Sequence, residues 1–490
     1  MSPFERILIR MSVPLLAEPR RAAVRDVAPP PSRSTALEAF DEAGVARFHW
    51  KAVLTSGMGF FTDAYDLFII GTVTAILAPL WHLSTLELSV LNATALAASV
   101  VGALLFGRLM DRFGRKPIYG MELLLLVSGA ILSAFAPSFG LLLLARIIVG
   151  IGVGGDYPTS AVIMSEYANR SRRGFLVTMV FAMQGLGLLA GPLVASAFLA
   201  SGLPHEMIWR LMLGLGALPA ASVFYLRRTL PEPPRYLVAS GRTSEARAVV
   251  SDLTGKEVTE DGTFARQSLL QQPFFLRLLG TAGCWFLVDV AFYGNGVSQQ
   301  LILRQMLPHA SLLGTTLISA GIFAIAAVPG YFVAAALMDK MGRKAIQGLG
   351  FVVMALAYGA MFLAPGILGN LPLFVGLYML SFFFIEFGPN TTTFLLPTEA
   401  FPTSVRGMGH GISAASGKIG AALGAFMMPL VLQSVGLPTT MGILALVSLA
   451  GALLTVIAIP EMSQRSLGLL EKLAEPKPGP VHLRARPEAN

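Results

Sequence analysis

The sequence predicts an all-α membrane protein whose twelve transmembrane helices form two pseudo-symmetric halves of six, and three observations predict it. Of the 490 residues, 54% are hydrophobic and only 13% are charged, about half the charged fraction of a soluble protein. Apolar stretches long enough to cross a bilayer, which takes roughly 20 helical residues, recur along most of the chain. A pair of loop motifs also recurs at nearly equal offsets in the two halves.

The same composition argues against several functional classes. The net charge is +8, but the basic residues lie in short loops between apolar stretches and not along a groove with aromatics, which argues against nucleic-acid binding. The single cysteine, Cys284, excludes a disulfide framework, and no Cys/His cluster predicts a metal site. The sequence shows no nucleophile–base pair and no nucleotide-binding loop, so we expect neither an enzyme nor a bound cofactor.

The spans divide into two groups around one long polar interruption. They are predicted near 52–80, 88–108, 117–136, 139–165, 174–200, 207–227, 277–304, 310–338, 346–364, 372–396, 407–432 and 438–459. The resulting domains are a cytosolic tail (1–48), the first half (49–227), a middle loop (228–274), the second half (275–460) and a second tail (461–490). The first tail contains no recognisable signal peptide, because Arg10 interrupts its short apolar patch.

Positive charge predicts the orientation of these spans. Lysines and arginines gather in the connections after the second, fourth, sixth, eighth and tenth spans, whereas the connections after the first, third, fifth, ninth and eleventh contain none. Because cytosolic loops carry the excess of Lys and Arg, both termini and the middle loop are expected in the cytosol. We therefore expect a multi-pass protein of a cell membrane, either a bacterial inner membrane or a plasma membrane.

An internal repeat relates the two halves. Residues 107–116 recur as 335–344, an offset of 228, and the Ser/Thr-Glu pair at Glu166 recurs at Glu399, an offset of 233. Proline–glutamate pairs at Glu232 and Glu461 also occupy corresponding ends of the halves. Two homologous halves with a substrate site between them are typical of alternating-access transporters.

The repeated decamer, Gly-x-Leu-x-Asp-Arg-x-Gly-Arg-Lys, is the loop signature of the major facilitator superfamily. Its glycine permits a tight turn, and its acidic and basic groups can pair between helix ends, so that they latch one conformation and release in the other. The alternative is that these charges are only positive-inside anchors. The predicted gating residues are Gly107, Asp111, Arg112, Gly114, Arg115, Asp339, Gly342 and Arg343.

Ionisable residues inside the spans are the candidates for function, because a central Asp costs about 2.5–3.5 kcal/mol to insert and therefore faces a cavity. They are Asp63, Asp66, Glu122, Arg146, Asp156, Asp289 and Lys418. The alternatives are that Arg146 only neutralises Asp63 or Asp66, that Glu122, Asp156 and Asp289 are buried structural acids, and that the nearby Trp285 faces lipid. Asp63 and Asp66, three residues apart, share one helix face.

Two further patterns surround these charges. Trp285, Asp289 and Tyr293 recur at four-residue steps, which predicts a stripe with a carboxylate between two aromatic donors. The string Gly388-Pro389-Asn390 is expected to break its helix and to expose polar backbone, which is tolerated only beside a water-filled cavity.

Four strings then identify a family resemblance. Residues 59–68, 154–161, 388–394 and 410–420 resemble the phosphate:proton symporters of fungi and plants, within the major facilitator superfamily, and the likeness runs from about residue 50 to 468. The resemblance implies the major facilitator fold. It also implies a phosphate cage, which consists of Tyr157, Gln184, Trp285, Asp289, Tyr293, Asn390 and Lys418. It implies proton-handling acids at Asp63, Asp66 and Asp156, with Glu122 and Arg146 in support.

The sequence departs from the family pattern outside this cage. The middle loop is short for a eukaryotic member, Thr159 stands where an apolar residue is usual, and Ala335 replaces the first glycine of the repeated decamer. These departures put the source organism in doubt more than the substrate.

The expected function is proton-coupled import of inorganic phosphate by alternating access, with protons as the coupling ion and a monomer as the working unit. A phosphate anion about 4 Å from the Asp289 carboxylate costs roughly 4 kcal/mol at an effective dielectric of 20, so bound phosphate favours protonation or compensation by Lys418. The alternatives are a porter for a sugar, an organic phosphate or another oxyanion such as sulfate or arsenate, and a low-flux nutrient sensor. Lys418 with two tyrosines suits a tetrahedral oxyanion better than a sugar.

Overall fold

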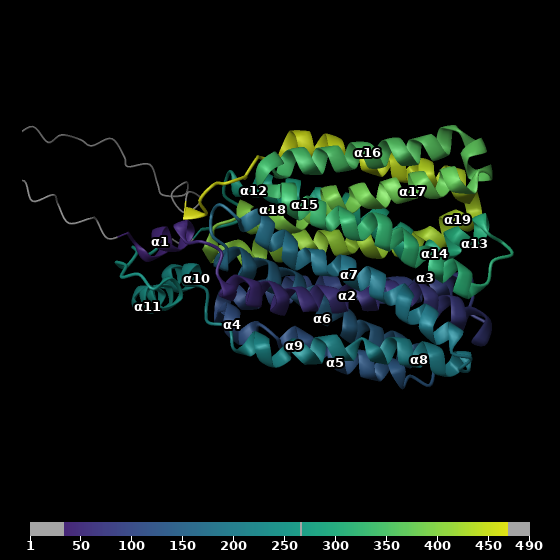
Figure 1. Cartoon of the computed structure of the whole chain (residues 1–490), viewed down its shortest axis with the longest axis horizontal. Helices are drawn as coiled ribbons and strands as arrows, with labels where there is room; N and C mark the ends of the chain where they lie inside the picture. Colours follow the sequence, from purple (N-terminus) through teal and green to yellow (C-terminus); the bar gives the residue numbers. More distant parts are fainter. Residues whose placement is uncertain (1–33, 265–266, 469–490) are drawn as a thin grey trace, which may run out of the picture.

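A computed structural model describes residues 34–264 and 267–468, and in these ranges the chain is helical, with one isolated bridge between Thr35 and Thr259. The outer parts of the two predicted tails, 1–33 and 469–490, lie outside the described residues. Long helices run side by side along the long axis of the molecule, and the first half (purple to blue) lies against the second half (green to yellow) (Figure 1).

The first half contains six candidate spans, which agree with the six predicted there. They are α2 (Arg47–Leu80), α3 (Thr85–Phe113), α4 and α5 (Arg115–Ile118 and Met121–Ala134), α6 (Phe139–Tyr167), α7 (Arg173–Ala200), and α8 and α9 (His205–Leu215 and Ala217–Arg228). The apolar side chains that these helices leave exposed, such as Leu104, Leu144 and Leu193, suit contact with lipid.

The second half repeats this arrangement with more interruptions. Its elements are α12 (Phe274–Val297), α13 (Gln299–Met306), α14 (Leu312–Ile322), η1 (Phe323–Ala327), α15 (Val328–Met341), α16 (Arg343–Leu363), η2 (Pro365–Gly369), α17 (Leu371–Ile385), η3 (Glu386–Asn390), α18 (Thr391–Ala400), η4 (Thr403–Val405) and α19 (Arg406–Ala458). The predicted seventh span divides at Ser298 into α12 and α13, and the eighth and tenth each contain a π-helical turn.

The last helix, α19, supplies two spans and not one. Gly436 has φ 75° and ψ 173°, a conformation that interrupts the helix and that glycine adopts without steric cost. At the start of α19, Arg406 donates a hydrogen bond to Glu166, and near its end the carbonyl of Val456 accepts one from Lys344. Glu166 and Lys344 both belong to the repeated motifs, so both ends of α19 lie beside the charged loops. The chain therefore turns back at Gly436, and the prediction of twelve spans is confirmed.

One end of the bundle carries the repeated loops and three short helices, and we call it the basic end. These helices are α1 (Ala36–Glu42), α10 (Pro234–Ala239) and α11 (Thr243–Thr254), at the left of Figure 1. Part of the segment predicted as a tail is therefore a helix, and its Phe40 packs with Val250 of α11. Burial raises the pKa of Asp41 on α1, but ion pairs with Arg235 and Arg173 outweigh this and hold the pKa below its usual value.

The two halves meet along pairs of equivalent helices. The helix α3 crosses the first part of α19, and α7 packs against α14 and α15. At the first crossing the backbones are so close that a Cβ on Gly107 would lie 2.6 Å from the carbonyl oxygen of Gly407. Small residues allow such close approach between helices in a membrane, where packing drives their association.

Candidate functional site

A cluster of buried polar side chains lies between the halves, and helices of both halves contribute to it. The hydroxyl of Tyr157 on α6 is 3.0 Å from the hydroxyl of Tyr293 on α12, so the cluster crosses the interface between the halves. Gln184 on α7 donates from Nε2 to the Tyr157 hydroxyl at 3.1 Å. All three side chains are buried.

Lys418 on α19 is the cation of this cluster. Its Nζ donates to the Tyr293 hydroxyl at 2.9 Å and lies 3.4 Å from Oδ2 of Asp289. The same ammonium group lies 4.0 Å from the centre of the Tyr157 ring, within the range of a cation–π contact. An ammonium has three donors, and Tyr293 and Asp289 take two of them here, so a further anion would take the third or displace one of these partners.

A second chain of hydrogen bonds extends the cluster into η3. Oε1 of Gln184 accepts from the Tyr331 hydroxyl at 2.6 Å and from Nδ2 of Asn390 at 3.2 Å. Nδ2 of Asn390 also lies 2.8 Å from the Tyr331 hydroxyl and 2.5 Å from Oε2 of Glu386. The network therefore joins Gln184 of the first half to three side chains of the second.

Aromatic rings close the cluster towards the basic end. Trp285 is 1% exposed, and its ring lies 5.9 Å from that of Tyr157 and 5.4 Å from that of His410. A Cβ on Gly417 would lie 2.3 Å from Trp285, so the glycine makes room for the indole against α19. Trp285 therefore faces the interior of the bundle and not lipid.

Asp156 and Glu122 share one arginine that the sequence analysis did not single out. Arg227, at the end of α9, donates to Oε1 of Glu122 at 2.5 Å and to both carboxylate oxygens of Asp156 at 2.7 and 3.0 Å. All three side chains are fully buried. Gly59 on α2 faces this group, and a Cβ there would overlap the Asp156 carboxylate.

The two acids on α2 lie in different surroundings although they share a helix face. Asp66 accepts two hydrogen bonds from Arg146 on α6, at 2.8 and 2.5 Å. Neither carboxylate oxygen of Asp63 has a hydrogen-bond partner in the described part of the chain, and this residue is fully buried. The charges of Asp156, Arg227 and Lys418 act on Asp63. Asp63 therefore lies between the polar cluster and the group that Arg227 forms with Asp156 and Glu122.

The structure thus brings together the seven residues of the implied cage, and three further buried polar residues, which the sequence analysis missed, bind cage residues or proton-handling acids. These are Arg227, Tyr331 and Glu386. Glu386 had a visible signal, since it interrupts the apolar run Phe382-Phe383-Phe384-Ile385 within a predicted span. Arg227 lay at the predicted end of a span. At such a position the sequence pattern does not distinguish an arginine in a loop from a buried one.

The expected break at Gly388-Pro389-Asn390 is present, and neighbouring threonines bind its backbone carbonyls. Gly388 has non-helical angles, φ −103° and ψ −111°, inside η3. The hydroxyls of Thr391 and Thr392 both donate to the Gly388 carbonyl at 3.0 Å, and Thr393 donates to the Pro389 carbonyl at 2.7 Å. Threonine side chains thus satisfy these freed carbonyls, while the expected water-filled cavity beside them stays a prediction.

The basic end is closed by two equivalent sets of contacts between the halves. Asp111 of α3 accepts hydrogen bonds from the backbone amides of Gly407 and Met408 at 3.1 and 2.7 Å. Asp339 of α15 accepts from the amides of Gly174 and Phe175 at 3.1 and 2.8 Å. Each aspartate thus lies at the N-terminus of a helix of the opposite half, where its negative charge is stabilised.

Buried ion pairs reinforce this closure. Glu166 binds Arg115 of its own half at 3.0 Å and Arg406 of the other half at 2.9 Å. Glu399 binds Arg343 of its own half at 2.8 Å, and Arg173 of the other half lies 3.9 Å away. The internal repeat predicted from the sequence therefore has a counterpart in matching contacts.

The remaining predicted gating residues form the turns of the two loops or lie outside the contacts that close the basic end. Gly114 and Gly342 have positive φ, 101° and 90°. Glu232 and Glu461 accept hydrogen bonds from the backbone amides of the helices that follow these glycines. Arg112 takes no part in the closure, since its exposed guanidinium lies over the Phe113 ring.

Asp111 and Asp339, which we call the latch aspartates, close the basic end. The double variant Asp111→Asn/Asp339→Asn removes both charges and is expected to weaken this closure. Each carboxylate at a helix N-terminus contributes roughly 1–2 kcal/mol, so the double variant loses about 2–4 kcal/mol, a factor of about 30 to 900 in the closed population. Hydrogen–deuterium exchange over the first two turns of α7 and α19 should rise accordingly. Asp252→Asn, an exposed acid on α11, is the matched control, and unchanged exchange in the double variant would contradict the latch.

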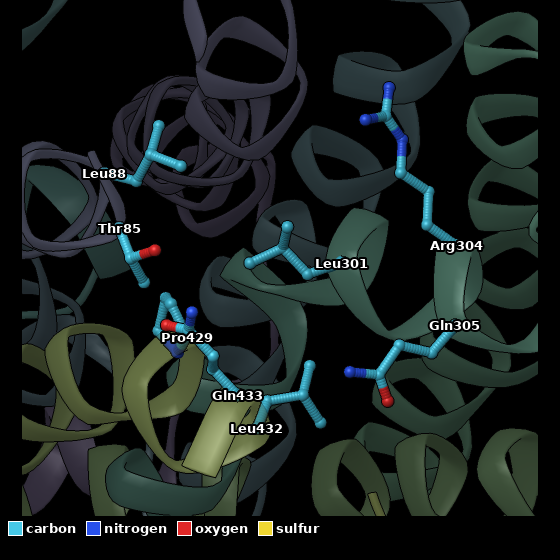
Figure 2. A pocket seen from close by; sticks show the side chains of 8 residues that line it. All are labelled: Thr85, Leu88, Leu301, Arg304, Gln305, Pro429, Leu432 and Gln433. Carbon is cyan, nitrogen blue, oxygen red and sulfur yellow. The ribbon is translucent and has the colours of Figure 1, made fainter. Parts of the chain in front are cut away.

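A cavity of about 360 Å³ lies at the opposite end of the bundle, between the halves. Side chains from α3, α13 and α19 surround it (Figure 2). A smaller cavity of about 50 Å³ adjoins it, and Arg304 is the charged residue that lines both. Asp289, Tyr293, Val297, Gln300 and Arg304 follow one face of α12 and α13, and therefore lead from the cluster towards this cavity.

Phe68 of α2 separates the cavity from the polar cluster. Its ring lies 5.4 Å from that of Tyr293 and 5.1 Å from that of Phe292. A Cβ on Gly296 would lie 2.3 Å from Phe68, and one on Gly71 would lie 2.4 Å from the Val297 carbonyl oxygen. In this conformation the cluster is therefore sealed by one aromatic layer on this side and by the latches on the other.

Comparisons with known proteins agree with this architecture. The family described as sugar (and other) transporter matches residues 42–474. The probable inorganic phosphate transporter 1-6 of Arabidopsis thaliana is 36% identical, and the alignment covers 90% of this chain and 97% of that protein. The low affinity inorganic phosphate transporter 3 of Petunia hybrida is 37% identical, with coverage of 89% and 94%.

Solved structures show the same fold. The major facilitator superfamily proton:xylose symporter XylE, bound to 6-bromo-6-deoxy-D-glucose, aligns with a TM-score of 0.74 at 20% identity. The alignment covers 87% of this chain and 99% of that one. At this identity the similarity concerns the fold, and it supports two six-helix halves.

Proposed function

This chain belongs to the sugar (and other) transporter family of the major facilitator superfamily, and we propose that it imports inorganic phosphate together with protons. The predicted membership of the superfamily is thereby confirmed, and the chain is a multi-pass membrane transporter and not an enzyme. The observation that carries the proposal is Lys418, a buried ammonium between Tyr157 and Tyr293 in a cluster shared by both halves.

The chemistry of the cluster suits a tetrahedral oxyanion. Phosphate needs a positive charge and several hydrogen-bond donors that converge on its oxygens. Lys418 supplies the charge, while the hydroxyls of Tyr157 and Tyr293 and the amides of Gln184 and Asn390 supply neutral donors. Inorganic phosphate is also the substrate in the names of the plant relatives.

Buried acids near the cluster supply the coupling to protons. Asp63 has no hydrogen-bond partner and no direct ion pair among the described residues. A carboxylate in such surroundings costs several kcal/mol when ionised, so Asp63 holds its charge only when Arg227 or Lys418 is released from other acids. Phosphate that occupies Lys418 therefore favours a proton on Asp63, and by reciprocity the proton favours phosphate.

The two seals of the cluster provide alternating access. We propose that the basic end faces the cytosol, as its arginines and lysines indicate. Opening the aromatic layer at Phe68 exposes the cluster to the cavity on the other side. Opening the latches of Asp111 and Asp339 exposes it to the cytosol. No step requires a second subunit, so we propose a monomer as the working unit.

The sugar, organic-phosphate and sensor functions stay as alternatives, and one uptake experiment separates them. Purified protein in proteoliposomes is given radiolabelled phosphate with and without an inward proton gradient, and sulfate, a hexose and a glycerophosphodiester are added as competitors. Accumulation that requires the gradient and resists these competitors is the expected result. A folded protein that binds phosphate without accumulating it would favour a sensor, and one without phosphate binding would overturn the proposal.

Arg304 is expected to assist the entry of the anion. It is exposed beside the cavity of about 360 Å³ opposite the basic end, which we call the outer cavity. A cation there raises the local anion concentration. Arg304→Gln should raise the KM for phosphate by up to about tenfold at low ionic strength, with kcat unchanged, and high salt should abolish the difference. Arg210→Gln is the control, because Arg210 is paired with Glu206 at 2.6 Å on α8 and does not line the cavity.

Equal KM values for Arg304→Gln and the wild type at low salt would show that this residue has no role in entry.

A further inference from the structure

Glu386 is a buried acid outside the set of proton-handling residues considered so far. It is the first residue of η3, and its side chain is fully buried. Oε2 accepts a hydrogen bond from Nδ2 of Asn390 at 2.5 Å, whereas Oε1 has no hydrogen-bond partner among the described residues. The acid therefore adjoins the candidate phosphate cage and retains one unoccupied oxygen.

The surroundings of Glu386 supply no positive charge. η3 packs against α12, α15, α16, α17 and α18. The titratable groups on these helices that interact with Glu386 are Tyr331, Tyr358 and Asp289, two phenols and an acid. In the described ranges no lysine, arginine or histidine pairs with it. An ionised carboxylate here would cost several kcal/mol, so Glu386 carries a proton in this conformation.

Asn390 links this proton to the anion site. Its single Nδ2 group faces three acceptors: Oε2 of Glu386, the Tyr331 hydroxyl and Oε1 of Gln184. An amide nitrogen has two N–H groups, so an anion that takes one must displace a present acceptor. A protonated Glu386 releases the amide more readily than a carboxylate does, because charge-assisted hydrogen bonds are roughly twice as strong as neutral ones.

We propose that Glu386 is a further proton-binding site, in the second half of the protein, whose proton binds and crosses together with phosphate. The proposal rests on the proposed function and extends it, because the proton on Glu386 adds to the proton handled by Asp63 and Asp156 in the first half. The proton enters with the anion from the outer cavity and leaves with it when the latches open. No covalent step or other reactant is involved.

The stoichiometry of transport tests this assignment. Wild-type protein and Glu386→Gln are compared in proteoliposomes at zero membrane potential with an inward gradient of one pH unit. One proton that moves down this gradient contributes about 1.4 kcal/mol, a factor of ten in accumulation. Glu386→Gln should therefore reach a phosphate accumulation about tenfold lower than the wild type, although its exchange of phosphate across the membrane without a gradient continues.

Glu206→Gln is the matched control, since it makes the same chemical change on α8, where Glu206 is 47% exposed. Equal accumulation in Glu386→Gln and the wild type would overturn the proposal. Infrared spectra give a second readout that does not need transport. The carbonyl band of protonated carboxyl groups should be weaker in Glu386→Gln than in the wild type and unchanged in the control. A band that is unchanged by Glu386→Gln would show that the residue is ionised.

These readouts separate the inference from the function on which it rests. If the wild type fails to accumulate phosphate, the proposed function fails, and the infrared difference still decides whether Glu386 carries a proton.

Discussion

Lys418→Met is expected to abolish phosphate binding. The substitution removes the cation of the cluster and leaves Asp289, which lies 3.4 Å from Nζ, buried without a counter-charge. Truncating one partner of a buried, hydrogen-bonded charge pair costs roughly 2–5 kcal/mol, which corresponds to a factor of about 30 to several thousand in the dissociation constant. Equilibrium binding of radiolabelled phosphate to protein in detergent measures this loss directly.

Two companion variants make the Lys418 result specific. Lys418→Met combined with Asp289→Asn removes both charges, so it should fold well but still bind no phosphate. Lys256→Met, an exposed lysine of the middle segment, should bind like the wild type. Folded Lys418→Met protein with wild-type affinity for phosphate would refute the cage and remove the main support for phosphate as the substrate.

Arg227→Met is expected to have the largest effect on stability. Arg227 is the only cation that pairs with Glu122 and Asp156 in the described part of the chain, and all three side chains are fully buried. Its removal leaves two carboxylates buried without a counter-charge, and breaking a buried ion pair in this way costs roughly 3–5 kcal/mol. The variant should therefore unfold at a markedly lower temperature and lose transport.

The single cysteine makes this prediction simple to measure. Cys284 is fully buried, so a thiol-reactive dye labels it when the bundle unfolds. Arg228→Met, the exposed neighbour, is the control and should unfold at the wild-type temperature. Adding Glu122→Gln and Asp156→Asn to Arg227→Met should restore much of the stability. If Arg227→Met alone is as stable as the wild type, the arginine does not hold these acids.

Membership of the family and the fold could be predicted from the chain because they depend on local and repeated properties. Apolar length predicts a span regardless of its neighbours, and Arg and Lys in the loops predict its orientation. The offset repeat of 107–116 at 335–344 then predicted two equivalent halves. In the structure both copies make the same contact. Asp111 accepts a hydrogen bond from the backbone amide of Gly407, and Asp339 accepts one from that of Gly174.

The partners of the buried charges, by contrast, were decided by tertiary structure. The sequence left Arg146 open between Asp63 and Asp66, and helix packing directs it to Asp66 alone. It placed Arg227 at a span boundary, whereas the packing of α9 against α2 and α5 brings it to Asp156 as a counter-ion. Glu386 likewise gained its significance from contact with Asn390 and from the absence of a cation in its described surroundings.

The physical reason is that sequence and packing determine different terms of the energy. Burial of apolar length is nearly additive along the chain, so composition and periodicity are sufficient to predict which segments enter the membrane. The energy of a buried charge depends on the distance to its counter-charge, and that distance joins residues such as Arg227 and Asp156, 71 positions apart. The sequence determined which charges enter the bilayer, and only the packing of the two halves decided which of them remain available for an anion and its protons.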